Sequence, residues 1–232
     1  GLFLLLLSCN TTKPTEKQTI ASAEKEFKTL LAKDWFLHIN KGLANGLELS
    51  KYGIETQDWV ATEVPNTVLA SLVAAEVYTD IYSGMNLSKI PIEQFKSSLI
   101  DYKSFSWDLK NGEKVVLDLD GINYRANIWL NGKQIADTST VFGVYKQFEF
   151  DVTANLSIDN KLVIEVFPSV PGDFTIGFVD WAPVPADNNM GIWREVSLVS
   201  SQGVSLTETY VYSDFDVTNP TTADLFISGL LK

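Results

Sequence analysis

The feature that most constrains the fold is a series of short alternating segments that fills most of the chain. In the clearest case, RANIWL and KQIAD flank the dipeptide Asn131-Gly132. Asn-Gly tolerates the positive φ angles of a two-residue turn, so the sequence predicts a β-hairpin here. Further strand-like runs follow at intervals of about 8–12 residues, a spacing typical of a β-sandwich or jelly roll. These runs are WFLHI, KVVLDLDGI, YKQFEFDVT, NKLVIEVFP, REVSLVSSQ, VSLTETYVYSDF and TADLFISGLLK.

Helical patterns are confined to two short places. Phe27, Leu30 and Leu31 share one side of a helical period within residues 22–35, which predicts a helix of one to three turns leading into the fold. A second short helix is predicted from Thr67 to Ala75. Helices and strands do not alternate, so neither a doubly wound sheet nor a (β/α) barrel is expected. We therefore predict an all-β fold, a jelly-roll β-sandwich.

Charge and rare residues narrow the function. The chain has 29 acidic and 18 basic residues, a net charge of -11, so nucleic acid is not an expected partner. With only Cys9 and His38 available, an internal disulfide and a Cys/His zinc site are excluded. A Ser-His-Asp triad would have to use His38, but the sequence contains no nucleophile-elbow motif. We therefore interpret His38 as a strand residue. No metal and no cofactor are expected.

The first residues, GLFLLLLSCN, form an apolar run that is too short to span a bilayer. The order Leu6-Leu7-Ser8-Cys9 resembles a bacterial lipobox, in which Cys9 is lipidated. The polar residues after it have the composition of a tether. We interpret residues 1–20 as lipoprotein signal and tether, and we expect an exported protein, a bacterial periplasmic or outer-membrane lipoprotein, that meets the membrane only through this lipid. The alternative is an N-terminal strand with a free cysteine.

Four landmarks, spread over residues 30–202, resemble the N-terminal sugar-binding domain of glycoside hydrolase family 2, which is galactose-binding-like. They are VPNTVLASLVAAEVYTDIYSGMNL, LDLDGINYRANIWLNGKQIAD, the late hairpin FEFDVTANL…NKLVIEV, and VDWAPVPADNNMGIWREVSL. The last, with Asp180-Trp181, resembles the branch of exo-β-D-glucosaminidases and β-mannosidases. The resemblance implies a sugar-binding jelly roll over residues 21–202 and the truncated start of an immunoglobulin-like domain at 203–232. It also implies a catalytic (β/α)8 barrel further downstream as a partner.

One strand departs from the pattern of that branch. Its members carry a Trp-Trp-Tyr-Arg-like strand before the long alternating one, whereas this chain has SSLIDYKSF at residues 97–105. Ligand contacts that the family makes from this strand therefore do not transfer to this chain.

The resemblance implies that the loop at residues 178–196 reaches the rim of the barrel's active site. An indole can stack on a sugar ring, and a carboxylate or amide can discriminate its hydroxyls. Pro183 and Pro185 stiffen the loop, and Gly191 permits the turn into a strand begun by Ile192 and Trp193. The alternative is that the polar residues are turn formers or caps and that the indole is packing. The predicted substrate-binding residues are Asp180, Trp181, Asn86, Asp187 and Asn189.

Other conspicuous residues are interpreted as structural. Trp129 and Trp193 alternate within strand patterns and are expected in the core. Asn123, Tyr124 and Arg125 form a polar-aromatic turn that we expect to be mainly structural.

No catalytic residue is expected. Retaining glycosidases use two carboxylates about 5–5.5 Å apart, and no Asp or Glu of this chain has an apolar setting that argues for a raised pKa. The favoured hypothesis is the non-catalytic sugar-binding domain of a retaining family 2 enzyme that removes terminal β-mannosyl or β-glucosaminyl residues. The alternatives are a stand-alone surface carbohydrate-binding lipoprotein and a structural remnant with an idle loop.

Overall fold

The computed structural model describes residues 5–7, 27–40, 42, 45–176, 180–218 and 221–231. These residues divide into two compact units, one of residues 27–200 and one formed by the described parts of 1–26 and 201–232. Cys9 and the expected lipidation site lie outside the described residues. None of the described helices has the length and apolar character required to cross a bilayer.

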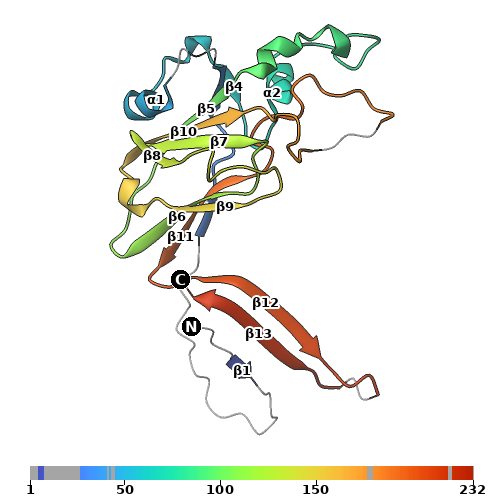
Figure 1. The fold of residues 1–232 in the computed structure, drawn as a ribbon. Helices are drawn as coiled ribbons and strands as arrows, with labels where there is room; N and C mark the ends of the chain where they lie inside the picture. The colour runs from blue at the N-terminus through green and yellow to red at the C-terminus, as the bar shows by residue number, and fades with distance from the viewer. Residues whose placement is uncertain are drawn as a thin grey trace. The chain divides into compact units, whose positions relative to one another are not determined.

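The larger unit is a sandwich of two β-sheets, as predicted (Figure 1). The six-stranded sheet has the order β4 (Val60–Thr62), β3 (Trp35–Ile39), β5 (Leu99–Ser106), β10 (Asp159–Phe167), β7 (Arg125–Leu130) and β8 (Lys133–Ala136). The four-stranded sheet has the order β2 (Phe27–Leu30), β11 (Val196–Gln202), β6 (Glu113–Leu119) and β9 (Phe148–Asp151). The jelly-roll sandwich that the sequence predicts is confirmed.

The main core lies between the two sheets, where alternate residues of facing strands are buried. Trp35, Leu99, Leu117, Ile128 and Leu198 are each at most 1% exposed. The predicted hairpin is confirmed, because Asn131 (φ 52°) and Gly132 (φ 77°) join β7 to β8 with the positive φ angles that such a turn needs.

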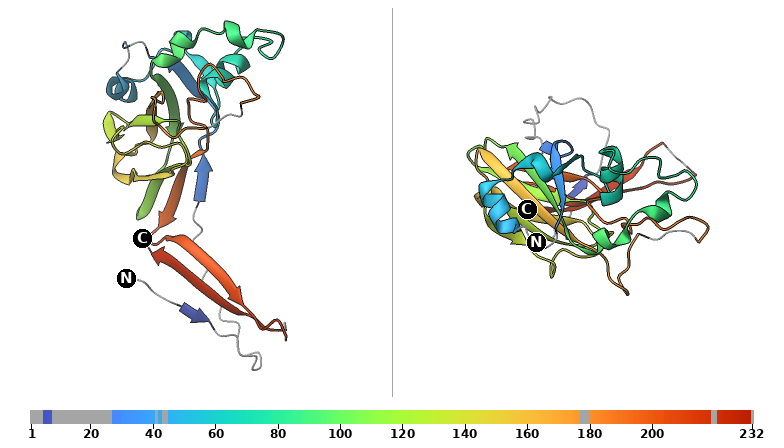
Figure 2. Two further views of the ribbon diagram at one scale, coloured as in Figure 1. Left: turned by 45° about the vertical axis from the view of Figure 1, so that its right-hand side comes forward. Right: turned by 90° about the horizontal axis from the view of Figure 1, so that it is seen from above.

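The outer face of the large sheet carries a second, smaller core. Ile100, Tyr102, Trp129 and Val163 are buried there. The helix α1 (Gly46–Tyr52) contacts β7 and β10 on this face, next to the 3₁₀ turn Thr56–Asp58 (Figure 2). Gly46 is required at the contact, since a Cβ atom on it would lie 2.3 Å from the Trp129 ring. The sequence did not predict α1, and the expected core residue Trp129 lies under this helix instead of between the sheets.

The second predicted helix is confirmed as α2 (Val68–Ala74), whose N-cap Thr67 accepts a hydrogen bond from the Ala70 amide. The first predicted helix is wrong over its described part, where β2 forms an edge strand paired with β11. Phe27 and Leu30 are 61% and 50% exposed, so the supposed apolar side of a helix does not pack as one. Pairing with β11 overrides the local periodicity.

Two further expectations need correction. β9 and β10 do not form a hairpin, because β9 pairs with β6 in the small sheet while β10 lies between β5 and β7 in the large one. The strand expected to begin at Ile192 begins at Val196. The 3₁₀ turn Thr153–Asn155 lies on the connection that crosses between the sheets.

The atypical segment at residues 97–105 forms the central strand β5. Residues 99–103 are all buried, so this strand keeps its place in the sheet without the aromatic and arginine residues of the family pattern. Alternation places Leu99 and Asp101 on the face toward the main core and Ile100 and Tyr102 on the outer face.

The smaller unit contains an antiparallel hairpin of β12 (Leu206–Asp214) and β13 (Asp224–Leu231). The short strand β1 (Leu5–Leu7) pairs with the other edge of β13. The immunoglobulin-like identity of residues 203–232 stays a prediction.

Candidate functional site

The loop that precedes β11 has an exposed first part. Asp180 is exposed, and Trp181 is 82% exposed. Among the described residues, the Asp180 carboxylate has neither a hydrogen bond nor an ion pair. Both side chains are therefore exposed to solvent, and their contact with a sugar stays a prediction.

The second part of the same loop is buried and fixed. Asp187 is 3% exposed, and its carboxylate accepts hydrogen bonds from the amides of Leu69 (2.8 Å) and Asn189 (3.0 Å). The Leu69 amide belongs to the first turn of α2, where helix amides lack partners within the helix. Asp187 thus joins the loop to α2. Its predicted contact with a sugar stays a prediction, and its observed hydrogen bonds go to main-chain amides.

Asn189 lies in the same anchored part, with a φ of 57°. Its carbonyl accepts a hydrogen bond from the Asn123 side chain at 2.8 Å, and the Asn188 carbonyl accepts one at 3.0 Å. Asn123 is 1% exposed, in agreement with its expected structural role. A buried amide from another loop therefore fixes the turn that follows Asp187.

Gly191 completes the anchor. It has a φ of 140°, and a Cβ atom on it would lie 2.8 Å from the Asn66 carbonyl oxygen. Beyond it, Trp193 is half-buried, and its indole donates a hydrogen bond to the Val144 carbonyl at 3.0 Å. The expected core position of Trp193 is thus only partly confirmed, since it packs at the end of the sandwich.

Asn86 lies on the opposite loop, directly before the 3₁₀ turn Leu87–Lys89. Its amide nitrogen donates to the Asp80 carbonyl (2.9 Å), and its oxygen accepts from the Lys89 ammonium (3.0 Å). It is half-exposed. Asn86 therefore shapes its own loop, and its role toward a sugar stays a prediction.

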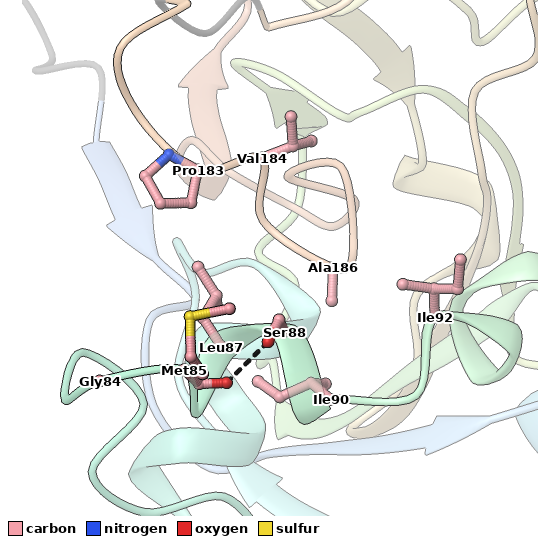
Figure 3. A pocket seen from close by; sticks show the side chains of 9 residues that line it. All are labelled: Gly84, Met85, Leu87, Ser88, Ile90, Ile92, Pro183, Val184 and Ala186. Atoms are coloured by element: carbon pink, nitrogen blue, oxygen red, sulfur yellow. Dashed lines mark hydrogen bonds between the residues drawn. The ribbon is translucent and has the colours of Figure 1, made fainter.

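The two loops face each other across an apolar groove of about 260 Å³ (Figure 3). Pro183, Val184 and Ala186 line one side. The other side belongs to the segment that runs into the 3₁₀ turn Ile92–Lys96. The prediction that these two loops lie near each other agrees with the structure. The residues that line the groove were not predicted, because the sequence of a loop does not indicate which surface an apolar side chain lines. The lining residues from this second loop are Gly84, Met85, Leu87, Ser88, Ile90 and Ile92.

The described residues that line this groove include no aspartate or glutamate, so they supply no pair of carboxylates for glycoside hydrolysis. The described part of the chain also holds no cluster of three or more metal-ligating side chains. Burial raises the pKa of Asp101 to about 8, so the expectation that no carboxylate has an apolar setting was wrong. Asp101 is 3% exposed, lies on the face of β5 toward the main core and does not line this groove.

A jelly-roll sandwich with a groove between two loops defines a galactose-binding-like type of domain, and similarity to known proteins supports this class. The family profile "Glycosyl hydrolase 2 galactose-binding domain-like" matches residues 48–173. An exo-β-D-glucosaminidase of Hypocrea jecorina is 32% identical over 189 residues, which are 79% of this chain and 21% of that enzyme. A mannosylglycoprotein endo-β-mannosidase of Lilium longiflorum is 30% identical over 185 residues, 68% of this chain and 19% of that enzyme.

Solved structures agree with these sequence relationships. The exo-chitosanase of Amycolatopsis orientalis superposes with a TM-score of 0.82 at 26% identity, covering 88% of this chain and 24% of that one. The chain belongs to the glycoside hydrolase family 2 galactose-binding-like domains. It spans about a fifth of the length of the curated relatives that it matches.

Proposed function

We propose that this chain is the sugar-binding domain of a retaining family 2 glycosidase and that the loop at residues 180–190 contacts the sugar. The intact polypeptide would remove terminal β-linked glucosamine or mannose with a downstream barrel. The observation that carries the proposal is the free Asp180-Trp181 pair next to a loop half that Asp187 and Asn123 hold in place.

The physical argument is preorganisation. The anchored half of the loop keeps the exposed half near one position, which lowers the entropy cost of binding. The Trp181 ring offers an apolar face to the C–H face of a pyranose, and the Asp180 carboxylate accepts hydrogen bonds from hydroxyls or an ammonium group. Support for glucosamine comes from the exo-β-D-glucosaminidases among the relatives.

Calorimetry tests the proposal. Glucosamine and mannose β-linked disaccharides are titrated into the wild-type chain and into an Asp180→Ala, Trp181→Ala double variant. We expect at least about tenfold weaker binding by the variant, which corresponds to about 1.4 kcal/mol. A matched control is the double variant Tyr52→Ala, Asp58→Ala, which removes an exposed ring and acid near α1. Absence of heat in both wild type and variant would leave only the structural-remnant hypothesis. Equal, measurable heats in both would show that sugar binding does not depend on Asp180 and Trp181, and would overturn their proposed role.

We also propose that the protein is exported and anchored through lipid on Cys9. Support comes from the apolar run that ends in Leu6-Leu7-Ser8-Cys9. Metabolic labelling with a palmitate analogue in a bacterial host should label the wild type and leave a Cys9→Ser variant unlabelled. Labelling of both proteins, or of neither, would contradict the anchor.

The stand-alone surface carbohydrate-binding lipoprotein differs from the enzyme in one observable respect. The reading frame beyond Lys232 continues into a barrel if the domain serves an enzyme, and it stops if the domain acts by itself.

A further inference from the structure

A second feature of the sandwich surface combines aromatic and basic side chains from three loops and from the first residue of β7. We call it the aromatic–basic surface and define it by Arg125, Tyr145, Lys146, Phe174, Trp193 and Arg194. None of these residues lines the groove described above.

Direct contacts make these residues one continuous surface. Tyr145 lies 5.8 Å from Phe174 and 5.8 Å from Trp193 between ring centroids, edge-on to the latter. The Arg125 guanidinium donates two hydrogen bonds, of 2.6 and 2.7 Å, to the carboxylate of Asp173, the residue before Phe174. A bidentate pair of this kind fixes the orientation of the loop that carries the Phe174 ring.

Two of the rings are open to a ligand. Phe174 is 76% exposed and Tyr145 is 54% exposed. Two neighbouring rings already have a cation over one face. The Arg194 guanidinium lies 4.6 Å from the centroid of the Trp193 ring, and the Lys146 ammonium lies 3.9 Å from the centroid of the Phe142 ring. Exposed aromatic rings held in place by neighbours are typical of a binding surface.

The charge of this surface is opposite to that of the chain. The chain has a net charge of -11 and contains only two arginines, and both lie here. With Lys146 they give three cations, of which Arg125 pairs with the carboxylate of Asp173. The carboxylates of Asp120 and Glu195, which border the cluster in sequence, share the one ammonium group of Lys28. These seven groups together carry a net charge of +1, since four are cations and three are carboxylates.

Arg194 and Lys146 each lie over an aromatic ring, and Arg194 is the one beside the Tyr145–Trp193 ring pair. It is exposed, and no carboxylate pairs with it among the residues that the structure describes. Its planar fork matches a carboxylate in bidentate geometry. An anionic group bound there would lie next to the open aromatic rings.

We propose that the aromatic–basic surface binds short oligosaccharides of uronic acids. A uronic acid presents an apolar C–H face to Phe174 and Tyr145 and a ring carboxylate to Arg194. A neutral sugar would use the rings alone, and a cationic one would be repelled by the arginine. The surface thus selects a class of sugar different from the one proposed for the loop at residues 180–190.

Calorimetry with the full chain and matched ligands tests this proposal. The probe is α-1,4-linked trigalacturonic acid, and its control is α-1,4-galactotriose, in which a hydroxymethyl group replaces each carboxylate. We expect the acidic trimer to bind at least about tenfold more tightly than the neutral trimer, because the neutral trimer cannot form the charge-assisted hydrogen bonds to Arg194. Arg194→Gln and Phe174→Ala should each raise its Kd at least about tenfold.

Matched variants separate the two sites. Lys133→Gln and Tyr52→Ala remove an exposed cation and an exposed ring elsewhere and should leave the Kd unchanged. The Asp180→Ala, Trp181→Ala variant should also bind the acidic trimer normally, so failure of one proposal does not decide the other. An unchanged urea midpoint confirms that each variant is folded.

Three results would overturn the proposal. They are equal binding of the neutral trimer, absence of binding, and binding that neither Arg194→Gln nor Phe174→Ala weakens. Self-association of the chain that Phe174→Ala abolishes, without any sugar binding, would assign the surface to a protein contact instead.

Discussion

Asp180 and Asp187 lie seven positions apart in one loop, yet their environments are opposite. Asp180 is exposed and has no partner among the described residues, whereas Asp187 is 3% exposed and accepts hydrogen bonds from two amides. Both were predicted to bind sugar because both are acids in a loop of the right family. The difference shows that main-chain donors within reach, and not residue type, decide which acid organises a loop and which stays free.

Asp101 adds a third environment, in which a carboxyl group is buried and one of its oxygens has no hydrogen-bond partner among the described residues. Its Oδ2 atom is buried and has no hydrogen-bond partner. Its neighbours across the sheet are Leu37 and Ile164, and Lys103 follows two residues later on the same face. Burial raises the pKa of Asp101 from its ordinary value of 3.8 to about 8. The folded protein therefore holds the neutral acid where an unfolded chain holds the carboxylate.

The largest predicted effect is the pH dependence that Asp101 confers. Between the two pKa values unfolding releases a proton, so raising the pH lowers the free energy of unfolding. We expect the wild type to lose about 2–3 kcal/mol relative to Asp101→Asn between about pH 5 and about pH 7, since each pKa unit is worth about 1.4 kcal/mol. Urea unfolding at each pH measures this difference. Parallel pH profiles of the two proteins would show that Asp101 ionises normally.

The next effect concerns the anchor at Asp187. Asp187→Ala leaves the Leu69 and Asn189 amides without their carboxylate partner, and we expect a loss of about 2–3 kcal/mol in the free energy of unfolding. Urea denaturation measures this loss. Asp187→Asn, which keeps one acceptor oxygen, should recover part of it. A loss below about 0.5 kcal/mol, which is usual for surface changes, would remove the distinction between Asp187 and Asp180.

Much of this fold could be predicted because strand periodicity and turn chemistry are local. The hairpin at Asn131-Gly132 and the helix α2 both follow from short sequence signals. The failures come from long-range pairing. The Phe27–Leu30 segment looks helical until β11 pairs with it, and β10 looks like the partner of β9 until each joins a different sheet.

The site was less predictable than the fold for the same reason. The order of the family landmarks predicted that the two loops lie at one rim, and residues of both loops line one groove. Their position at an active site stays a prediction. No local signal indicated that Asp187 would reach the Leu69 amide, 118 residues earlier in the chain. The apolar lining from Met85 and Val184 was also missed, because a loop sequence does not reveal which side chains face the groove.

Asn123 offers a sharper test of the anchored half of the loop. Asn123→Ala removes two hydrogen bonds to the carbonyls of Asn188 and Asn189, so we expect a loss of about 1–2 kcal/mol in the free energy of unfolding. Sugar binding should also weaken, although Asn123 is 1% exposed and cannot itself reach a ligand. Urea unfolding and calorimetry measure the two effects. Asn160→Ala is the matched control, because the Asn160 side chain is also 1% exposed and donates to two main-chain carbonyls, those of Phe105 and Ser157, and Asn160 does not line the groove. Unchanged binding with reduced stability would mean that the exposed half does not depend on this anchor.

The smallest predicted effect on stability belongs to the exposed half of the loop. The Asp180→Ala, Trp181→Ala variant should unfold within about 0.5 kcal/mol of the wild type, because it removes no buried contact. Its tryptophan fluorescence should lose the fraction most accessible to acrylamide, since Trp181 is 82% exposed while Trp35 and Trp129 are at most 8% exposed. Trp129→Phe, a change in a buried ring, is the contrasting control and should lower stability without removing that fraction. If the double variant were clearly destabilised, the Asp180-Trp181 pair would belong to the folded scaffold, and its availability to a sugar would have to be abandoned.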